Sequence, residues 1–254
     1  MEVAYSWLDN LPMEPVNKLL NPIADSLGQG IGGIFYWIFQ KPIQFKVIKE
    51  AEVQDLANKT AERLQKIPEK NRDTSNRGLL MKTIEEAQYS ISEDDLRTMF
   101  ANLIASSADN RKNNLISPRF PTILSQLSGE DARLLQTIHN QPSFQLPLGF
   151  LELQFNDVNK GSRRLSTYLS LTSDNHILSS IDANLDTLSS LGIIKVLDNT
   201  WLTASHYLKQ YDLIEDLLLN TQKISKINMD GTVELNKGIL RTTDFGINFL
   251  NCVL

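Results

Sequence analysis

The sequence has few of the residues from which metal and redox sites are built. Its 254 residues include one cysteine, Cys252, and three histidines, His139, His176 and His206. A single cysteine excludes a disulfide within the chain and any zinc site with several cysteine ligands. The four residues lie too far apart in the sequence to have ligand spacing, so we expect no metal site and a buried structural role for each histidine.

Positive charge is not in excess either. The chain carries 25 Lys and Arg against 30 Asp and Glu, which gives a formal net charge of −5. Such a chain has no general basic field that would attract nucleic acid or an anionic membrane. The sequence also lacks the G-x-S-x-G, P-loop and H-E-x-x-H motifs of common enzyme classes. We therefore assign no catalytic residue and expect that the protein is not an enzyme.

One glycine-rich segment has the spacing of a dinucleotide site. In "GQGIGG", Gly28, Gly30 and Gly33 fit the pattern G-x-G-x-x-G. A dinucleotide site also needs a buried strand directly before the first glycine. Residues 17–27 instead carry apolar side chains at the 3.6-residue period of a helix. The strand is missing, so we expect no bound cofactor.

The same region has the composition of a docking surface. Ala24, Gly28 and Gly32 recur every four residues, a spacing that lets another helix approach closely, and an aromatic group follows them. The partner would be another protein or a second copy of the chain. Docking at a membrane surface and packing of the helix end into the core are the alternatives. The predicted partner-binding residues are Gly28, Gly32, Phe35, Tyr36, Trp37 and Phe39.

No segment is expected to cross a membrane. The most apolar stretch, residues 23–39, contains Asp25 and is shorter than the roughly 20 apolar residues that a spanning helix needs. The first residues, "MEVAYSWLDNLPMEP", lack the basic and apolar regions of a signal peptide. We therefore expect a cytoplasmic protein, with association at a membrane surface through residues 23–39 as an alternative.

Helical signals dominate the first half of the chain. Residues 42–66 and 79–87 have apolar stripes at helical spacing. Ser92 is predicted to cap a further helix, with Asp95 at the capping-box position, and Ser128 repeats the pattern with Asp131. We predict a mainly α fold that begins with a helical domain over residues 1–127.

The second half combines helical and extended signals. A helix over residues 180–191 is followed by an extended run, a hairpin that turns at residues 236–238, and a last helix that starts near Thr243. This order resembles a winged helix. Residues 205–220 read as an inserted helix. We therefore predict a winged-helix-like α+β domain over residues 128–254.

Charge argues against DNA binding by this domain. The would-be recognition helix carries Asp182 and Asp186 and has no Lys or Arg. Residues 128–254 contain 10 Lys and Arg against 14 Asp and Glu, and basic side chains are needed along the phosphates. We expect a module for protein contacts and no nucleic acid partner; a DNA-binding transcriptional regulator is the alternative.

Three stretches together resemble one protein family. They are "LNPIADSLGQGIGGIFYWI", "SISEDDLRTMFANLIASSAD" and "ISPRFPTILSQLSGEDARLLQTI", with the best anchors at residues 93–105 and 117–135. The chain resembles the Abi-alpha, or abortive infection alpha, family of bacterial and phage-associated proteins. Residues 200–235 fit no pattern of this family. The resemblance implies antiviral defence against phage and brings no catalytic motif, so we expect a defence protein that acts through contacts with a phage or host protein.

Overall fold

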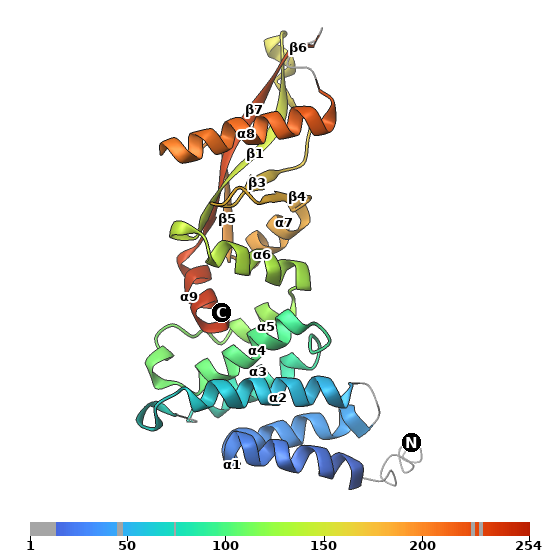
Figure 1. Cartoon of the computed structure of the whole chain (residues 1–254), viewed down its shortest axis with the longest axis vertical. Coiled ribbons are helices and arrows are strands. Elements are labelled where there is room, and N and C mark those ends of the chain that lie inside the picture. Colours follow the sequence, from blue (N-terminus) through green and yellow to red (C-terminus); the bar gives the residue numbers. More distant parts are fainter. Residues whose placement is uncertain (1–13, 45–47, 74, 225–226, 229–230) are drawn as a thin grey trace. The chain divides into compact units, whose positions relative to one another are not determined.

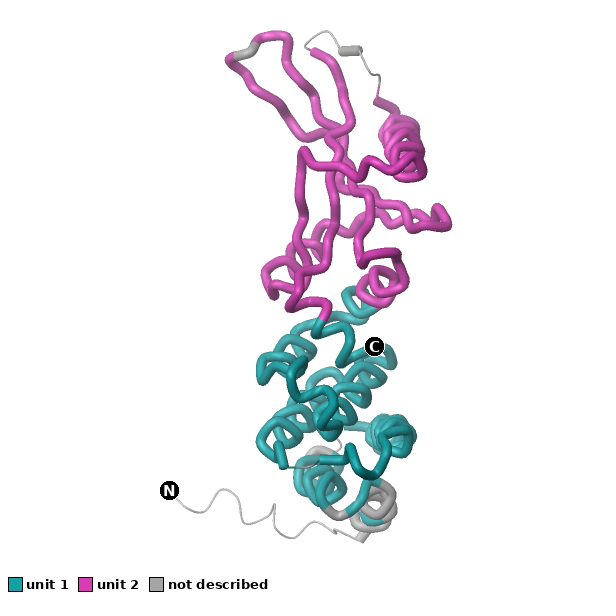
Figure 2. The backbone as a smooth tube through the Cα atoms, turned by 90° about the vertical axis from the view of Figure 1, so that its left-hand side faces the viewer, with its two compact units in different colours: residues 1–132, 248–254 teal, residues 133–247 magenta. Residues whose placement is uncertain are grey.

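The chain forms two compact units. The computed structural model describes residues 14–44, 48–73, 75–224, 227–228 and 231–254. Unit 1 consists of residues 1–132 and 248–254, and unit 2 of residues 133–247 (Figures 1 and 2). Unit 2 is therefore inserted, in sequence, between two parts of unit 1. Our expected division after residue 127 kept all C-terminal residues in the second domain.

Unit 1 is helical. Helix α4 packs against α2, α3 and α5, and α1 packs against α2 and α3. The apolar positions predicted for α4, among them Met99 and Phe100, are buried as expected. The helices are α1 (Glu14–Gln44), α2 (Glu50–Gln65), α3 (Arg77–Ala87), α4 (Asp94–Ser107), α5 (Phe120–Ser125), the 3-10 turns η2 (Glu69–Asn71) and η3 (Asn110–Lys112), and parts of α6 (Gly129–His139) and α9 (Asp244–Val253).

The start of α4 is held by charge pairs. Its N-cap is Glu93 and makes no side-chain cap hydrogen bond, so the predicted cap at Ser92 is wrong. Instead, the Asp94 carboxylate accepts hydrogen bonds from Lys59 of α2 (2.6 Å) and from Arg97 (2.8 Å). The hydrogen bond from Lys59 lowers the pKa of Asp94. The start of α4 is thus tied to α2 by an ion pair, which does not replace the backbone hydrogen bonds of a side-chain cap.

The predicted capping box at the start of α6 is confirmed. The Ser128 hydroxyl accepts a hydrogen bond from the backbone N–H of Asp131 (3.1 Å), and the Asp131 carboxylate accepts one from the N–H of Ser128 (2.9 Å). These reciprocal bonds satisfy amide groups that have no partner inside the helix.

The C-terminal residues are fastened to unit 1 by three side chains. Lys112 donates to the carbonyl of Asn251 (2.7 Å), Ser106 to that of Cys252 (2.8 Å), and Asn102 to that of Val253 (2.8 Å). The last carbonyls of a helix lack intrahelical partners, so these bonds close the end of α9. Cys252 itself is buried, and this burial raises the pKa of its thiol to about 11.

Unit 2 is built on a seven-stranded antiparallel sheet. The strand order is β4-β3-β1-β7-β5, while β2 pairs with β1 and β6 with β7. The long strands β1 and β7 pair along their whole length (Figure 1). The elements are η4 (Pro142–Phe144), β1 (Gln145–Phe155), η5 (Val158–Lys160), β2 (Ser162–Arg164), β3 (Leu169–Leu171), β4 (Ile177–Ser179), α7 (Asp182–Ser190), β5 (Ile194–Asp198), α8 (Ser205–Gln222), β6 (Ile227–Asn228) and β7 (Gly231–Thr242).

The predicted inserted helix is confirmed as α8 and covers part of the sheet. It packs on β1 and β3 (Figure 1). Its buried residues Tyr211 and Ile214 belong to the same apolar cluster as Leu151, Leu153 and Val233 of the sheet. Burial of such side chains contributes about 1.5–3 kcal/mol each, so α8 is an integral part of the unit.

The predicted fold class is wrong. The sheet makes the protein α+β and not mainly α, although the expected helical N-terminal region is present. The hairpin was expected to turn at residues 236–238, but these lie inside β7. A Cβ at Gly238 would lie 3.1 Å from the carbonyl oxygen of Leu197. This glycine therefore allows neighbouring strands to approach and does not mark a turn.

A charged side chain between two rings links β2 to α7. The Arg164 guanidinium lies 4.6 Å from the Phe150 ring centroid and 4.1 Å from that of Tyr168. It also pairs with Asp182 at 2.6 Å. Tyr168 in turn donates its hydroxyl to Asp198 (2.9 Å). Asp182, which we placed on a recognition helix, is thus part of an internal ion pair.

We expect Tyr168 to titrate late. Burial, with the hydrogen bond to Asp198, raises the pKa of Tyr168 to about 12, whereas an unperturbed tyrosine titrates near about 10. Its contribution to stability is therefore complete below pH 10 and is lost as the pH rises toward about 12. Subtracting the spectrophotometric titration curve of Tyr168→Phe from that of the wild type should leave the ionisation of Tyr168 alone. A difference curve centred at the ordinary tyrosine value would contradict the assignment.

Candidate functional site: a groove between α1 and α3

The first helix is broken at Gly28. This residue has φ 78° and ψ 160°, a conformation outside the helical region that glycine adopts without steric cost. Gly28 is exposed and Gly32 is buried. The kink interrupts the four-residue repeat of small side chains, so the continuous small-residue face that we predicted does not exist. The arm of α1 after Gly28 carries the candidate site.

The aromatic group of α1 divides between core and surface. Phe35 and Phe39 are fully buried, with ring centroids 4.8 Å apart, and Tyr36 is half-buried. Trp37 is 59% exposed. Phe35 and Phe39 thus follow the core-packing alternative, and the exposed aromatic cluster that docking at a membrane surface would use is reduced to Trp37.

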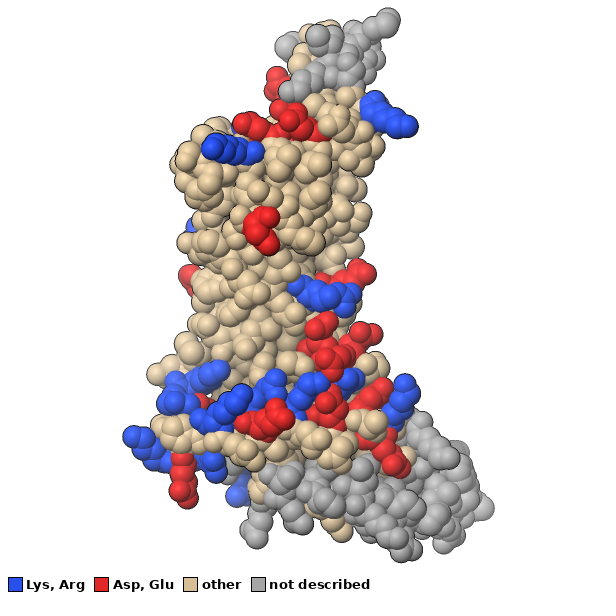
Figure 3. Space-filling view, viewed as in Figure 1, with Lys and Arg blue, Asp and Glu red and all other residues tan. Residues whose placement is uncertain are grey.

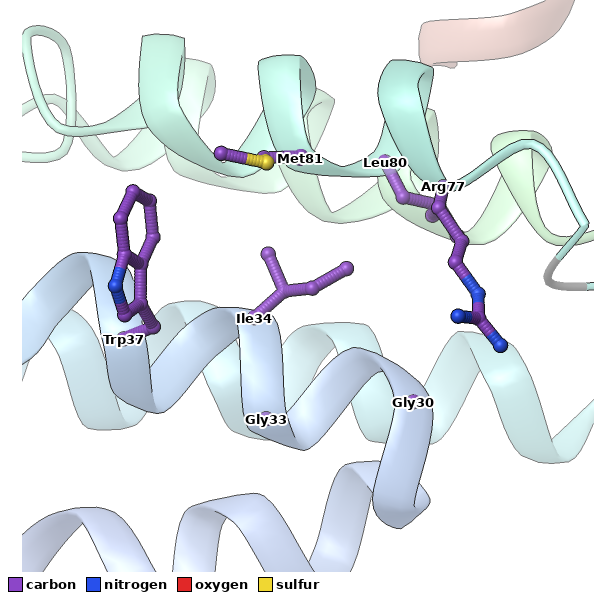
Figure 4. A pocket seen from close by; sticks show the side chains of 7 residues that line it. All are labelled: Gly30, Gly33, Ile34, Trp37, Arg77, Leu80 and Met81. Atoms are coloured by element: carbon purple, nitrogen blue, oxygen red, sulfur yellow. The ribbon is translucent and has the colours of Figure 1, made fainter.

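Trp37 lines a groove between α1 and α3. The groove has a volume of about 710 Å³. Figure 4 shows Ile34 and Trp37 extending from α1 toward Leu80 and Met81 of α3, with Arg77 at the end opposite Trp37. The lining residues are Gly30, Gly33, Ile34, Trp37, Arg77, Leu80 and Met81.

Glycines shape the α1 wall of this groove. Gly30 and Gly33 lie one helical turn apart, and a Cβ at Gly33 would meet no atom within 4 Å. Gly33 lines the groove, so this open space belongs to the groove. An incoming side chain therefore reaches the backbone of α1 directly, as in other helix contacts that use small residues.

Of the predicted partner-binding residues, Trp37 lines the groove. Gly28, Gly32, Phe35, Tyr36 and Phe39 do not. The sequence analysis missed the α3 wall, because the pairing of α1 with α3 is a tertiary contact. Gly30, Gly33 and Trp37 recur at helical spacing, which was the available signal; the sequence analysis had used the two glycines only to test a dinucleotide motif.

The groove is lined by large apolar side chains, by glycine backbone and by one cation. Arg77 is exposed and has no ion pair with any residue that the structure describes. Trp37 and Met81 are large apolar side chains left 59% and 39% exposed. Tryptophan and arginine are the residues that most often dominate binding energy at interfaces, and methionine adapts to varied partners. This combination suits an apolar ligand surface with a nearby carboxylate.

Other kinds of site find little support among the described residues. These residues include no group of three or more His, Cys, Asp or Glu that could hold a metal ion. None of the described helices has both the length and the hydropathy needed to cross a bilayer. On the face drawn in Figure 3, basic and acidic side chains of unit 1 are interleaved, so this face is not a uniform basic surface.

The structure defines an α+β protein whose helical unit carries a groove with exposed apolar side chains and whose second unit is built on an antiparallel sheet. The sequence model of the abortive infection alpha family matches residues 48–253. The chain therefore belongs to this family, which confirms the resemblance found in its sequence. No curated protein and no solved structure matches the chain.

Family membership points to abortive infection defence as the biological role. The match includes α3 and all of unit 2, and it also spans residues 200–235, which fitted no family pattern in the sequence analysis. The α1 wall of the groove, with Trp37, precedes the matched range. The groove thus joins a family segment to a segment outside the family model.

Proposed function

We propose that the protein acts in abortive infection defence by binding a protein of phage or host origin in the α1–α3 groove, without catalysing a reaction. The observation that carries this proposal is the exposed Trp37 opposite Met81 in a groove that Ile34 and Leu80 also line. Large apolar side chains gain free energy when a partner removes them from water, at about 25 cal/mol for each Å².

The groove suits an amphipathic helix as the bound segment. Two neighbouring helices form a groove in which the apolar face of a third helix can be buried. In such complexes the contacting side chains recur at positions i, i+3 or i+4, and i+7 along a helix. Gly30, Ile34 and Trp37 have this spacing on α1. An acidic residue on the incoming helix would pair with Arg77 and fix its direction.

Trp37→Ala is expected to abolish phage protection while the fold is retained. Loss of an anchor of this kind weakens binding by about 2 kcal/mol or more, which is about thirtyfold in affinity. The measurement is plaquing efficiency and culture survival of bacteria that express each variant, against an empty vector. The thermal midpoint should change little, because Trp37 is mostly exposed.

Trp201→Ala is the matched control. Trp201 is 50% exposed and belongs to unit 2. Its substitution removes a tryptophan of similar exposure that does not line the groove. Protection should persist in this variant and fail in Met81→Glu. Equal protection by wild type and Trp37→Ala would contradict binding in the groove. Unchanged plaquing with the wild type across a broad phage panel would contradict the defence role.

A further inference from the structure

Two cations of unit 2 face each other across neighbouring strands. Lys195 on β5 and Arg241 on β7 are register partners in the antiparallel ladder. Register partners lie on the same face of a sheet, with Cβ atoms about 4.5–5.5 Å apart. Both side chains are exposed, and neither has an ion pair with any residue in the described part of the chain. Directly opposed like charges destabilise a sheet.

A role in preventing another chain from pairing with the sheet edge would explain Lys195 but not Arg241. Strand β5 lies at an edge of the sheet, where a lysine discourages pairing with another chain. Strand β7 is flanked by β1 and β5, so Arg241 has no such role. An anion that contacts both side chains would relieve the repulsion and account for the pair.

The pair lies in the wall of a hollow. This hollow has a volume of about 520 Å³ and is large enough for a small organic molecule. Leu197 and the half-buried Phe245 give it an apolar part. Asp244, the first residue of α9, adds a carboxylate that accepts hydrogen bonds. The lining thus combines two cations, an aromatic ring and one acceptor.

We propose that this hollow binds a nucleoside phosphate. Lys195 and Arg241 contact the phosphate, and the planar guanidinium of Arg241 donates two parallel hydrogen bonds to its oxygens. The base packs against Phe245 and Leu197, and a sugar hydroxyl donates to Asp244. The ligand neutralises the opposed cations and so stabilises the pairing of β5 with β7. The site is independent of the groove in unit 1.

The test is calorimetric titration of the full chain with the four common ribonucleoside monophosphates, with inorganic phosphate and with adenosine. At least one nucleotide should bind saturably and more tightly than phosphate, and adenosine should bind least. Lys195→Ala and Arg241→Ala should each weaken nucleotide binding about tenfold or more, because each removes a hydrogen bond to a charged group. Absence of saturable nucleotide binding would overturn the proposal.

Lys209→Ala is the matched control for charge. Lys209 is exposed on α8, outside the hollow, so this variant has the same net charge as Lys195→Ala. Nucleotide binding should be unaffected in Lys209→Ala. If Lys195→Ala and Lys209→Ala weakened nucleotide binding equally, the binding would reflect non-specific attraction of an anion to positive charge, and the proposal would be overturned.

Thermal melting without ligand gives an independent readout. At low salt, Lys195→Ala should melt at a higher temperature than Lys209→Ala, because it removes the repulsion across the β5–β7 ladder. Addition of the bound nucleotide should raise the midpoint of the wild type and of Lys209→Ala, and should leave that of Lys195→Ala nearly unchanged. A lower midpoint for Lys195→Ala would mean that the cations stabilise the sheet themselves, which contradicts the proposal.

Discussion

Phe249→Ala is expected to lower the free energy of unfolding of unit 1 by about 3–5 kcal/mol. Phe249 is fully buried, and its ring lies edge to face with that of Phe120, which is also fully buried, at a centroid distance of 5.3 Å. Truncation removes this contact and leaves a cavity that the packed helices cannot fill completely.

Hydrogen exchange resolved by segment is the measurement of choice for Phe249→Ala, because the two units can unfold separately. Protection of α4 and α5 should fall sharply. Leu254→Ala is the control: Leu254 is 37% exposed, so its truncation should change stability by no more than about 0.5 kcal/mol. Unchanged protection of α5 in Phe249→Ala would show that the C-terminal residues do not complete this core.

Gly246→Ala is expected to destabilise unit 2 by about 3 kcal/mol, near the upper end for overpacking. A Cβ at Gly246 would overlap the carbonyl oxygen of Ile193 and lie 2.8 Å from Cγ2 of Thr242. The Ile193 carbonyl cannot move freely, because it accepts hydrogen bonds from the backbone N–H (2.9 Å) and the hydroxyl (3.1 Å) of Thr243.

Chemical denaturation compares this variant with Gly78→Ala. Gly78 lies in α3, and a Cβ added there meets nothing within 4 Å. The same substitution should therefore stabilise unit 1 by about 0.5–1 kcal/mol, because alanine favours the helix and restricts the unfolded chain. Equal effects of the two substitutions would contradict the close approach at Gly246.

The sequence predicted those elements whose signals are local. The buried face of α4, the capping box at Ser128 and Asp131, and the helix α8 all depend on residues within a few positions of one another. Helix spacing and capping act over that range, so they can be recognised without the rest of the fold.

The sheet was missed because its pairing is not local. The segment Asn-Lys-Gly at 236–238 has the composition of a turn, but pairing along the whole of β1 keeps it extended. Gly238 also accepts a hydrogen bond at its carbonyl from the hydroxyl of Tyr211 in α8 (2.7 Å). Contacts with β1, with β5 and with α8 thus override the local preference, and none of them is visible in residues 236–238 alone.

The candidate site was predicted in part for the same reason. A run of aromatic residues indicated Trp37, but the sequence did not distinguish it from its neighbours Phe35 and Phe39, which face the core. Phe35 and Phe39 lie four residues apart and share a helix face that Trp37 does not share, but the sequence alone did not show which face packs into the core. Arg77 and Met81 come from another helix, and nothing in their own sequence context connects them to Trp37.

The insertion of unit 2 into unit 1 affects folding during synthesis. A ribosome releases residues 1–132 long before residues 248–254. The side chains of Asn102, Ser106 and Lys112 are therefore made before the carbonyl groups at the end of α9 to which they donate hydrogen bonds. Phe120 is likewise synthesised before Phe249, with which its ring packs. Unit 1 thus reaches its full stability when translation has passed unit 2, and a product that stops before residue 248 presents an unfinished core to cellular proteases.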